Sequence, residues 1–348
     1  MTVRPRVTVT GAEPTVFAAG SPTDIGRALG AAGRAATHAR LVDTRAWQAA
    51  AAFVGSDRLA ALEAATRRHH PAVAAEIEGL AEGLGLAFGP VFAWACRGDL
   101  PGVLWPVAPD AGADGCTTVA WRDGAGGGVL AHNEDGAPAL RGGVVLARVE
   151  PDDAPAFTAF CYPGSPAGHA FAWTDAGLVQ TVNNIRAVRP GLGVPRIVRC
   201  RAALAGRTLA EARALLEAGP AAGAFHHLLA RPGEGLLGLE TAAEGTAADP
   251  GGPTVLHANH ALWGAPDDQI VTASSAARQA RIAALAATTW PSPPAETDLA
   301  RTLDDRADPA FPVFRTGPTD TDGEATLGRL VARVTADSLV CSATLFGP

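Results

Sequence analysis

A series of short runs of alternating or β-branched residues, separated by glycine-rich turns, occupies residues 116–185. Such runs are typical of antiparallel strands, because neighbouring side chains on a strand point to opposite faces of the sheet. Residues 24–92 instead carry apolar residues at spacings of three and four, which predicts helices interrupted at Pro71. Between these regions, residues 93–115 are rich in proline, glycine and aspartate, and we expect a loop there.

The later segments also alternate between helical and strand-like patterns. The patterns predict a helical region at 196–219, a hairpin at 223–245, a strand at 254–262, a helix at 274–289, a surface excursion at 291–325 and a strand pair at 329–346. Helices, strands, helices and strands therefore follow one another in blocks. This order indicates an α+β layered fold rather than alternating βαβ units.

Composition excludes several classes of function. The 348 residues carry a formal net charge of −7 and no cluster of basic residues, so nucleic acid is not an expected partner. All 28 basic residues are arginine, which excludes a Schiff-base or P-loop lysine mechanism. The glycines at 124–128 precede no helix, so a hairpin turn is a better interpretation than a phosphate loop.

The five cysteines are scattered and form no C-x-x-C pair, which argues against a disulfide framework and a structural zinc site; they are Cys96, Cys116, Cys161, Cys200 and Cys341. The N-terminal residues lack a continuous apolar core of the signal-peptide type, and no apolar run is long enough for a membrane span. We expect a cytoplasmic protein that requires no metal and no organic cofactor.

Cys116 stands out among the cysteines because it follows Asp114-Gly115. A thiol at this position can attack the unhindered Gly115 carbonyl, and water can then release a chain that begins with cysteine. The new α-amine, with an ordinary pKa near 8, would be a general base beside its own thiol. The alternative is a small buried residue on a strand, since cysteine is among the most buried residue types.

The motif His132-Asn133-Glu134-Asp135 has two interpretations as well. It is either a polar hairpin end or a place where Asp135 accepts hydrogen bonds from the new α-ammonium of Cys116. For Glu134 we expect an exposed turn carboxylate, with recognition of a cationic substrate group as the alternative.

Two further strand-like segments contain asparagines, which strands normally avoid. Asn183 and Asn184 end one segment, and Asn259 lies between His257 and His260 in another. A side-chain amide presented from a strand is a good oxyanion donor in acyl transfer. A metal site on the two histidines is disfavoured, because residues three apart on a strand face opposite sides.

Several strings in the right order then resemble one family. They are "DGCTT" (114–118), "AHNEDG" (131–136), "CYPGSPAGHAFAWTDAGLVQTVNNI" (161–185), "GVPR" (193–196), "HANH" (257–260) and "SSAARQARI" (274–282). Together they resemble the acyl-coenzyme A:6-aminopenicillanate (isopenicillin-N) acyltransferase family, peptidase family C45. Relatives include β-alanyl-dopamine hydrolase and, more distantly, bile-salt hydrolases and penicillin V acylases.

The resemblance implies an N-terminal-nucleophile (Ntn) hydrolase, a four-layer αββα sandwich of two antiparallel sheets flanked by helices. It also implies autocatalytic cleavage between Gly115 and Cys116. Residues 1–115 would remain as a helical small chain beside the catalytic chain 116–348, in one integrated fold. The catalytic residues it implies are Cys116, Asp135 and Asn259, and the supporting or substrate-binding candidates are Thr117, His132, Asn133, Asn183, Asn184, Ser275 and Arg278.

Departures from the family pattern occur at two of these positions. The distant hydrolases carry arginine where this chain has His132, and many relatives have an aromatic residue in place of Glu134. Either Asn183 or Asn184 fits the second asparagine that the bile-salt hydrolase group uses beside the oxyanion.

We therefore predict a self-processing cysteine amidohydrolase or acyltransferase acting on a small N-acyl amine or amino-acid amide through a Cys116 thioester. Hydrolysis is favoured over transfer, for which an acyl-CoA is a candidate donor. The expected macromolecular partner is the chain's own other fragment. The rivals are a catalytically silent binding protein and a Ser/His hydrolase. Secondary metabolism, such as antibiotic tailoring, is one of several pathways that fit.

Overall fold

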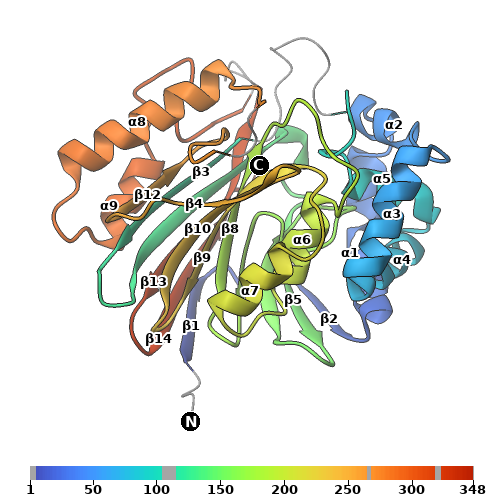
Figure 1. Ribbon diagram of the computed structural model, residues 1–348, viewed down its shortest axis with the longest axis horizontal. Helices are drawn as coiled ribbons and strands as arrows, with labels where there is room; N and C mark the ends of the chain where they lie inside the picture. Colours follow the sequence, from blue (N-terminus) through green and yellow to red (C-terminus); the bar gives the residue numbers. More distant parts are fainter. Residues whose placement is uncertain (1–4, 104–114, 265–267, 318–322, 348) are drawn as a thin grey trace.

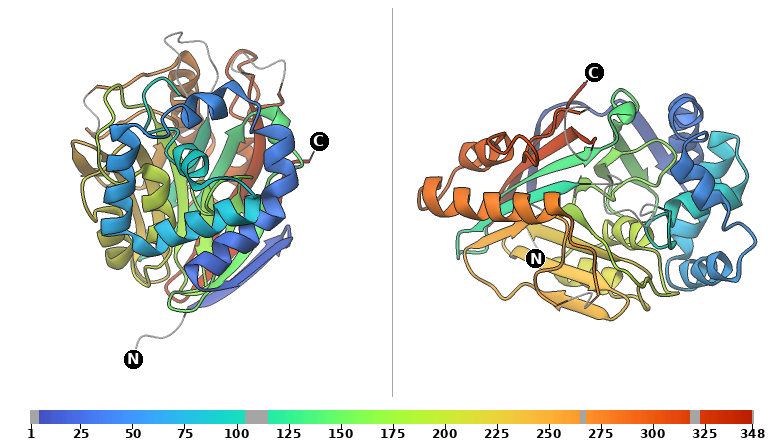
Figure 2. Two further views of the ribbon diagram at one scale, coloured as in Figure 1. Left: turned by 90° about the vertical axis from the view of Figure 1, so that its right-hand side faces the viewer. Right: turned by 90° about the horizontal axis from the view of Figure 1, so that it is seen from above.

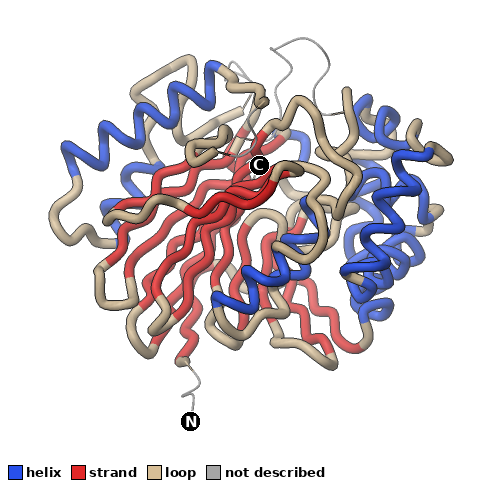
Figure 3. The backbone as a smooth tube through the Cα atoms, in the orientation of Figure 1, coloured by secondary structure: helices blue, strands red, loops and turns tan. Residues whose placement is uncertain are grey.

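The computed structural model of the chain describes residues 5–103, 115–264, 268–317 and 323–347. Two stacked sheets form its centre, and helices lie on both outer sides (Figures 1 and 3). One sheet has the order β1 (Arg6–Gly11), β14 (Ser338–Leu345), β13 (Ala325–Val334), β4 (Gly128–Gly136), β3 (Cys116–Arg122) and β12 (Thr254–His257). The other has the order β11 (Gly245–Ala248), β10 (Gly235–Ala242), β9 (Ala224–Arg231), β8 (Val179–Ile185), β7 (Phe171–Thr174), β6 (Phe157–Cys161), β5 (Val145–Pro151) and β2 (Val16–Gly20).

The helices divide into three groups (Figure 2). The first group forms a lobe at one end of the sandwich: α1 (Pro22–Arg40), α2 (Arg45–Ala51), α3 (Asp57–His69), α4 (Pro71–Leu84) and α5 (Phe88–Ala95). The second group packs on the β9 side, α6 (Arg196–Ala203) and α7 (Leu209–Leu216), and the third on the β3–β4 side, α8 (Ala273–Thr289) and α9 (Glu296–Leu303). A short 3-10 helix covers Pro138–Leu140.

Neighbouring side chains on a strand pack alternately against the other sheet and against the outer helices, which gives the fold its four layers. On β4, Leu130 packs into the core between the two sheets, whereas Val129 and Ala131 pack under α8 and α9 with Ile282. On β9, Leu228 faces the inter-sheet core, and the following Leu229 joins a separate cluster with α7. Because successive side chains on a strand face opposite sides, the central strands of each sheet are buried on both faces, whereas the edge strands β1 and β11 are largely exposed. The predicted α+β sandwich is confirmed.

Most strand pairs are antiparallel, as expected, but each sheet also contains a parallel pair. β1 pairs with β14, and β2 pairs with β5, in parallel registers. These two N-terminal strands were not predicted from the sequence. As a result, the segment before Cys116 contributes a strand to each sheet as well as the helical lobe.

Close backbone contact holds the lobe together where α1 crosses α4. A Cβ atom on Gly26 would lie 1.9 Å from the Glu76 carbonyl oxygen, and one on Gly79 would lie 2.0 Å from the Thr23 carbonyl oxygen. Only glycine permits the two helices to approach so closely. The interruption predicted at Pro71 is confirmed, because α3 ends at His69 and α4 begins with this proline.

Two other segments bear on the sequence predictions. The predicted excursion at 291–325 contains α9, which buries Leu299 and Leu303, so its description as a surface loop was wrong in that part. Of the loop predicted at 93–115, residues 104–114 lie outside the described residues, and residues 93–95 belong to the end of α5, so the prediction was wrong for those three residues. Among the helices that the structure describes, none combines the length and apolar character of a membrane-spanning segment.

Candidate active site

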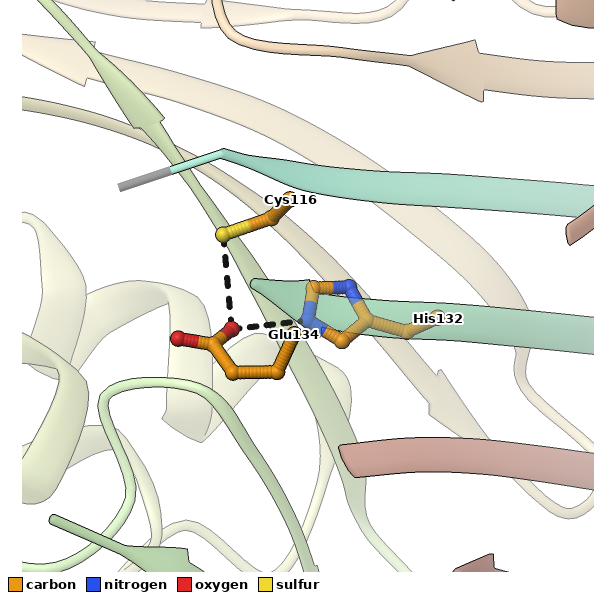
Figure 4. Close-up of side chains that lie close together, drawn as sticks. All are labelled: Cys116, His132 and Glu134. Atoms are coloured by element: carbon orange, nitrogen blue, oxygen red, sulfur yellow. Dashed lines mark hydrogen bonds and ion pairs between the residues drawn. The ribbon is translucent and has the colours of Figure 1, made fainter. Parts of the chain in front are cut away.

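Cys116 begins β3 and lies opposite Glu134 of β4 in the antiparallel register. The Cys116 thiol donates to Glu134 Oε2 at 3.3 Å, and the same oxygen lies 3.1 Å from His132 Nε2 (Figure 4). His132 and Glu134 share one face of β4 because they are two residues apart. The hydroxyl of Tyr162 donates to the other Glu134 oxygen at 2.7 Å.

This arrangement corrects the expectation for Glu134. The residue is 4% exposed and lies within a strand rather than at a turn, and its carboxylate contacts the candidate nucleophile. Burial lowers the pKa of His132 to about 3, so its imidazole is neutral at physiological pH. The site is therefore a thiol beside a carboxylate, supported by a neutral imidazole and a phenol.

The peptide bond between Gly115 and Cys116 is held on both sides. The Asp135 backbone N–H donates to the Gly115 carbonyl oxygen at 2.9 Å. The Cys116 backbone N–H donates to Asn259 Oδ1 at 3.0 Å. On the other side of the bond, the Gly115 N–H donates to Glu324 Oε2 at 3.0 Å. The bond predicted to be cleaved thus lies in a fixed, buried frame beside the thiol.

Helix α8 supplies the support for Asn259. Arg278 of this helix donates to Asn259 Oδ1 at 2.6 Å, to the Cys116 carbonyl oxygen at 2.8 Å and to Thr117 Oγ1 at 2.9 Å. One turn earlier, Ser275 Oγ accepts the Asn259 backbone N–H at 2.8 Å. Burial lowers the pKa of Arg278 to about 10, which still leaves it a cation at neutral pH. The Ser275–Arg278 spacing therefore aligns Cys116 and Asn259.

Asp135 has a different environment from the one expected of it after cleavage. In the intact chain its carboxylate accepts a hydrogen bond from the Thr326 hydroxyl at 2.7 Å and lies 3.5 Å from Arg315 Nε. Burial raises its pKa to about 6, against the opposing effect of Arg315. Its backbone N–H is the part that touches the scissile peptide. Contact with a free Cys116 α-amine stays a prediction.

The two asparagines of β8 face opposite ways. Asn183 is enclosed with Thr118, whose hydroxyl donates to its Oδ1 at 2.7 Å, and with His226. Asn184 lines a cavity together with Cys116, and its Oδ1 accepts from Arg196. Among the described residues, Asn184 Nδ2 has no hydrogen-bond partner. The Nδ2 of Asn259, by contrast, donates to the Asn184 carbonyl oxygen at 3.2 Å. Of these two side-chain amides, only that of Asn184 has an NH₂ group without a partner among the described residues, and this residue lines the cavity.

The remaining predicted residues lie farther from the thiol. Asn133 faces α9, donating to the Leu303 carbonyl oxygen at 2.9 Å and accepting from Arg329 at 2.8 Å. His257 contacts Glu240 at 3.0 Å and His260 contacts Ser275 at 2.8 Å, so the two histidines belong to separate clusters.

The cavity beside Cys116 has a volume of about 480 Å³. Its walls come from both sides of the predicted cleavage point: Trp94 and Arg97 from the N-terminal lobe, and Glu134, Tyr162 and Asn184 from the sheets. A volume of this order fits a small organic molecule. The ligand atoms of Cys116, His132 and Glu134 lie within 4.8 Å of one another, so these residues could also hold a metal ion.

Reasoning from the sequence missed several residues of this site. Arg315, Glu324 and Thr326 lie outside every string that carries the family resemblance, and Tyr162 was not singled out within its own string. One signal was available, because Tyr162 is the single tyrosine of the chain and lies within a string that carries the family resemblance.

The chain matches the family described as Acyl-coenzyme A:6-aminopenicillanic acid acyl-transferase over residues 121–338. This range covers more than half of the sequence and includes Glu134, Asn259 and Arg278, whereas Gly115 and Cys116 lie just before it. The resemblance seen in the sequence strings is thereby confirmed. A search of curated proteins finds no significant match.

Proposed function

The chain belongs to the acyl-coenzyme A:6-aminopenicillanic acid acyl-transferase family, and on that basis we propose that it is a self-processing cysteine amidohydrolase or acyltransferase. Family membership supports acyl transfer or hydrolysis in general terms. The observation that carries the finer proposal is the Cys116 thiol, which lies beside a buried carboxylate and adjoins a peptide bond held at both its oxygen and its nitrogen.

Maturation begins with attack of the Cys116 thiol on the carbonyl carbon of Gly115. Glu134 accepts the thiol proton, and the developing oxyanion remains on the Asp135 backbone N–H. The C–N bond then breaks, and the Cys116 nitrogen takes up a proton while it stays on Asn259 Oδ1. Water hydrolyses the resulting thioester, which leaves a Gly115 carboxylate and a free Cys116 α-amine.

Turnover reuses the same thiol with a different base. The α-amine has an ordinary pKa near 8, and the neighbouring Arg278 cation favours its neutral form. The amine takes the thiol proton as sulfur attacks the acyl carbonyl of an N-acyl amine, and it returns this proton to the leaving amine. The Asn184 amide stabilises the oxyanion, and Asn259, predicted from the sequence as that donor, holds the α-amine through Oδ1.

The acyl-thioester is then released to water in hydrolysis, or to an amine acceptor in transfer. We propose hydrolysis as the main reaction, on a small N-acyl amine or amino-acid amide that fits the 480 Å³ cavity. An acyl-CoA serves as donor only in the transfer reaction. No step requires a metal or an organic cofactor.

Cleavage would leave residues 1–115 and 116–348 as two fragments of one fold. The N-terminal fragment supports this, because β1 and β2 complete the two sheets. A buried ion pair between Glu76 and Arg201, at 2.8 Å, also joins the fragments. Because β-sheet pairing and the buried pair both cross the division, we expect the fragments to copurify.

Intact-mass measurement tests the maturation step. Wild-type protein should give two fragments that divide at 115/116, whereas Cys116→Ala should remain a single chain. A panel of N-acyl amines and amino acids, monitored for release of free amine, then tests turnover. A wild-type chain that stays whole and inactive would favour a binding protein, and full activity in Cys116→Ala would favour a Ser/His hydrolase.

A further inference from the structure

Arg97 lies in the cavity wall in an environment that is unusual for a charged residue. It follows α5 and is 7% exposed. Its guanidinium donates to the Trp94 carbonyl oxygen at 3.1 Å and to Ser165 Oγ at 3.4 Å, and it lies 3.3 Å from His169 Nε2. The guanidinium carbon also lies 4.6 Å from the centroid of the Trp94 ring. All four of these contacts are with neutral groups.

The lack of an anion is significant because burying an unpaired charge is costly. Arg97 forms no salt bridge with a carboxylate of the described residues, although its charge is one of those that oppose the rise in the pKa of the buried Asp99 carboxyl. The nearby acid, Asp99, instead accepts the Arg196 backbone N–H at 3.2 Å. The two carboxylates of the cavity are also engaged, Glu134 by the Cys116 thiol and Tyr162, and Glu324 by Arg315 and the Gly115 N–H. Arg97 is thus a desolvated cation that borders an open volume.

A series of contacts separates this cation from the nucleophile. Arg97 contacts His169, whose ring stacks on Tyr162 with centroids 5.3 Å apart. Tyr162 donates to Glu134, which accepts from the Cys116 thiol. Arg97 and Cys116 both line the cavity, and this run of contacts along its wall passes through three side chains, those of His169, Tyr162 and Glu134. A ligand that reaches both must carry its anionic group several bonds away from the reacting carbonyl.

We propose that Arg97 binds a carboxylate of the substrate, so that the enzyme acts on N-acyl amines that carry an acid group remote from the scissile amide. This inference rests on the proposed function, because it names the substrate class of the same cavity. A planar guanidinium suits a carboxylate because it can donate two parallel hydrogen bonds. Trp94 and Leu41 supply an apolar wall for the carbon chain of such a substrate.

Protection of Cys116 from alkylation by iodoacetamide tests the inference without requiring turnover. The probes are pairs that differ only in the acid group: N-acyl amino acids and dicarboxylic monoamides of increasing length, each against its primary amide. For the best pair, the acid should protect wild-type Cys116 at a concentration about tenfold or more below that of the amide, the range expected for a charge-assisted hydrogen bond. The two series distinguish an acid on the amine side from one on the acyl side.

Arg97→Gln should abolish the preference for the acid, and Arg97→Lys should restore part of it. Arg68→Gln, which removes the same charge from an exposed position on α3, is the matched control and should keep the wild-type preference. Thermal unfolding shows whether the variants fold, and Arg97→Lys covers the case in which Arg97→Gln does not. Equal protection by acid and amide in the wild type, or an undiminished preference in Arg97→Gln, would overturn the inference.

The proposed function fails separately from this inference. If the wild-type chain is never cleaved at 115/116, self-processing is wrong, whatever the probes show. If cleavage occurs but the acid group has no effect on protection, only the role of Arg97 is wrong.

Discussion

Replacement of Glu134 by glutamine should slow maturation strongly without unfolding the protein. In the intact chain no α-amine exists at Cys116, so another group must accept the thiol proton. Glu134 Oε2 is 3.3 Å from the sulfur. The Glu134→Gln side chain has the same shape and can still accept the Tyr162 hydroxyl, but an amide is not a base at neutral pH.

The size of the effect follows from the role of a positioned base. Such a group contributes about 10²- to 10⁴-fold, which corresponds to about 3 to 5 kcal/mol of activation free energy. His132 Nε2 lies 3.1 Å from the same carboxylate oxygen. It is the group best placed to take over in part, so we expect a loss near the lower end of this range and a larger loss in Glu134→Gln/His132→Gln.

A time course of intact mass or of denaturing gels on freshly purified precursor measures the cleavage rate directly. Glu150→Gln is the matched control, because that carboxylate is exposed on β5 and pairs only with Arg148 among the described residues. The thermal midpoint of Glu134→Gln should stay close to the wild-type value. Cleavage of folded Glu134→Gln at the wild-type rate would refute the assignment of Glu134 as the base.

Four other predictions follow from named contacts. Gly115→Ala should slow cleavage, measured by intact mass, because a Cβ there would lie 2.7 Å from Glu324 Oε2 among buried residues. Cleavage of Gly115→Ala at the wild-type rate would show that these residues can move to accept the extra methyl group. Asn184→Ala should mature normally but lose about 10²–10³ in kcat for amine release; an unchanged kcat would exclude it as the oxyanion donor. Gly79→Ala should lower stability in urea denaturation, because its Cβ would meet the Thr23 carbonyl oxygen at 2.0 Å; unchanged stability would contradict the close crossing. Burial lowers the pKa of His227 to about 3, so its stabilising effect is complete above pH 6.5 and falls at lower pH. By pH 5 the loss in the free energy of unfolding amounts to about 2 kcal/mol. In urea denaturation, His227→Gln should therefore lose about that much less stability than the wild type between pH 7.5 and 5, and equal losses in the two proteins would contradict the prediction.

The sequence was informative wherever burial imposed a periodic pattern. On β4, Val129, Leu130 and Ala131 pack into two different cores, so both faces of the strand are apolar. Short apolar, β-branched or alternating runs of this kind, separated by glycine turns, identified the strands from 116 to 185. β1 escaped prediction because its residues are mostly exposed, and it exists through pairing with β14. α9 escaped because proline and aspartate dominate its surroundings, although Leu299 and Leu303 have helical spacing.

The candidate site shows the same limit. Cys116 could be proposed because it follows Asp114-Gly115, and Asn259 because strands normally avoid asparagine, whereas Arg278 was proposed because it lies in a string that resembles the family. Glu134 was misinterpreted because the partners that bury it are distant in sequence: Cys116 begins β3, and Tyr162 directly follows β6. Local composition favoured a turn there, and only the strand register shows that the side chain faces the thiol. Its spacing of two residues from His132 was the one local hint.

The position of Glu134 also bears on why a self-processing cysteine enzyme would need a carboxylate at all. In the proposed mechanism, the α-amine that serves as base in turnover is a product of maturation, so it cannot catalyse its own release. A carboxylate beside the thiol solves this problem in the precursor, but after cleavage it lies beside both the sulfur and the new amine. There it would favour the ammonium form, which is not a base, whereas the Arg278 cation on the carbonyl of Cys116 acts in the opposite sense. The balance of these two charges sets the fraction of amine that is free to act. In the mature enzyme, Glu134→Gln should therefore shift the rising limb of the pH–rate profile for amine release to lower pH, even though the same change slows maturation.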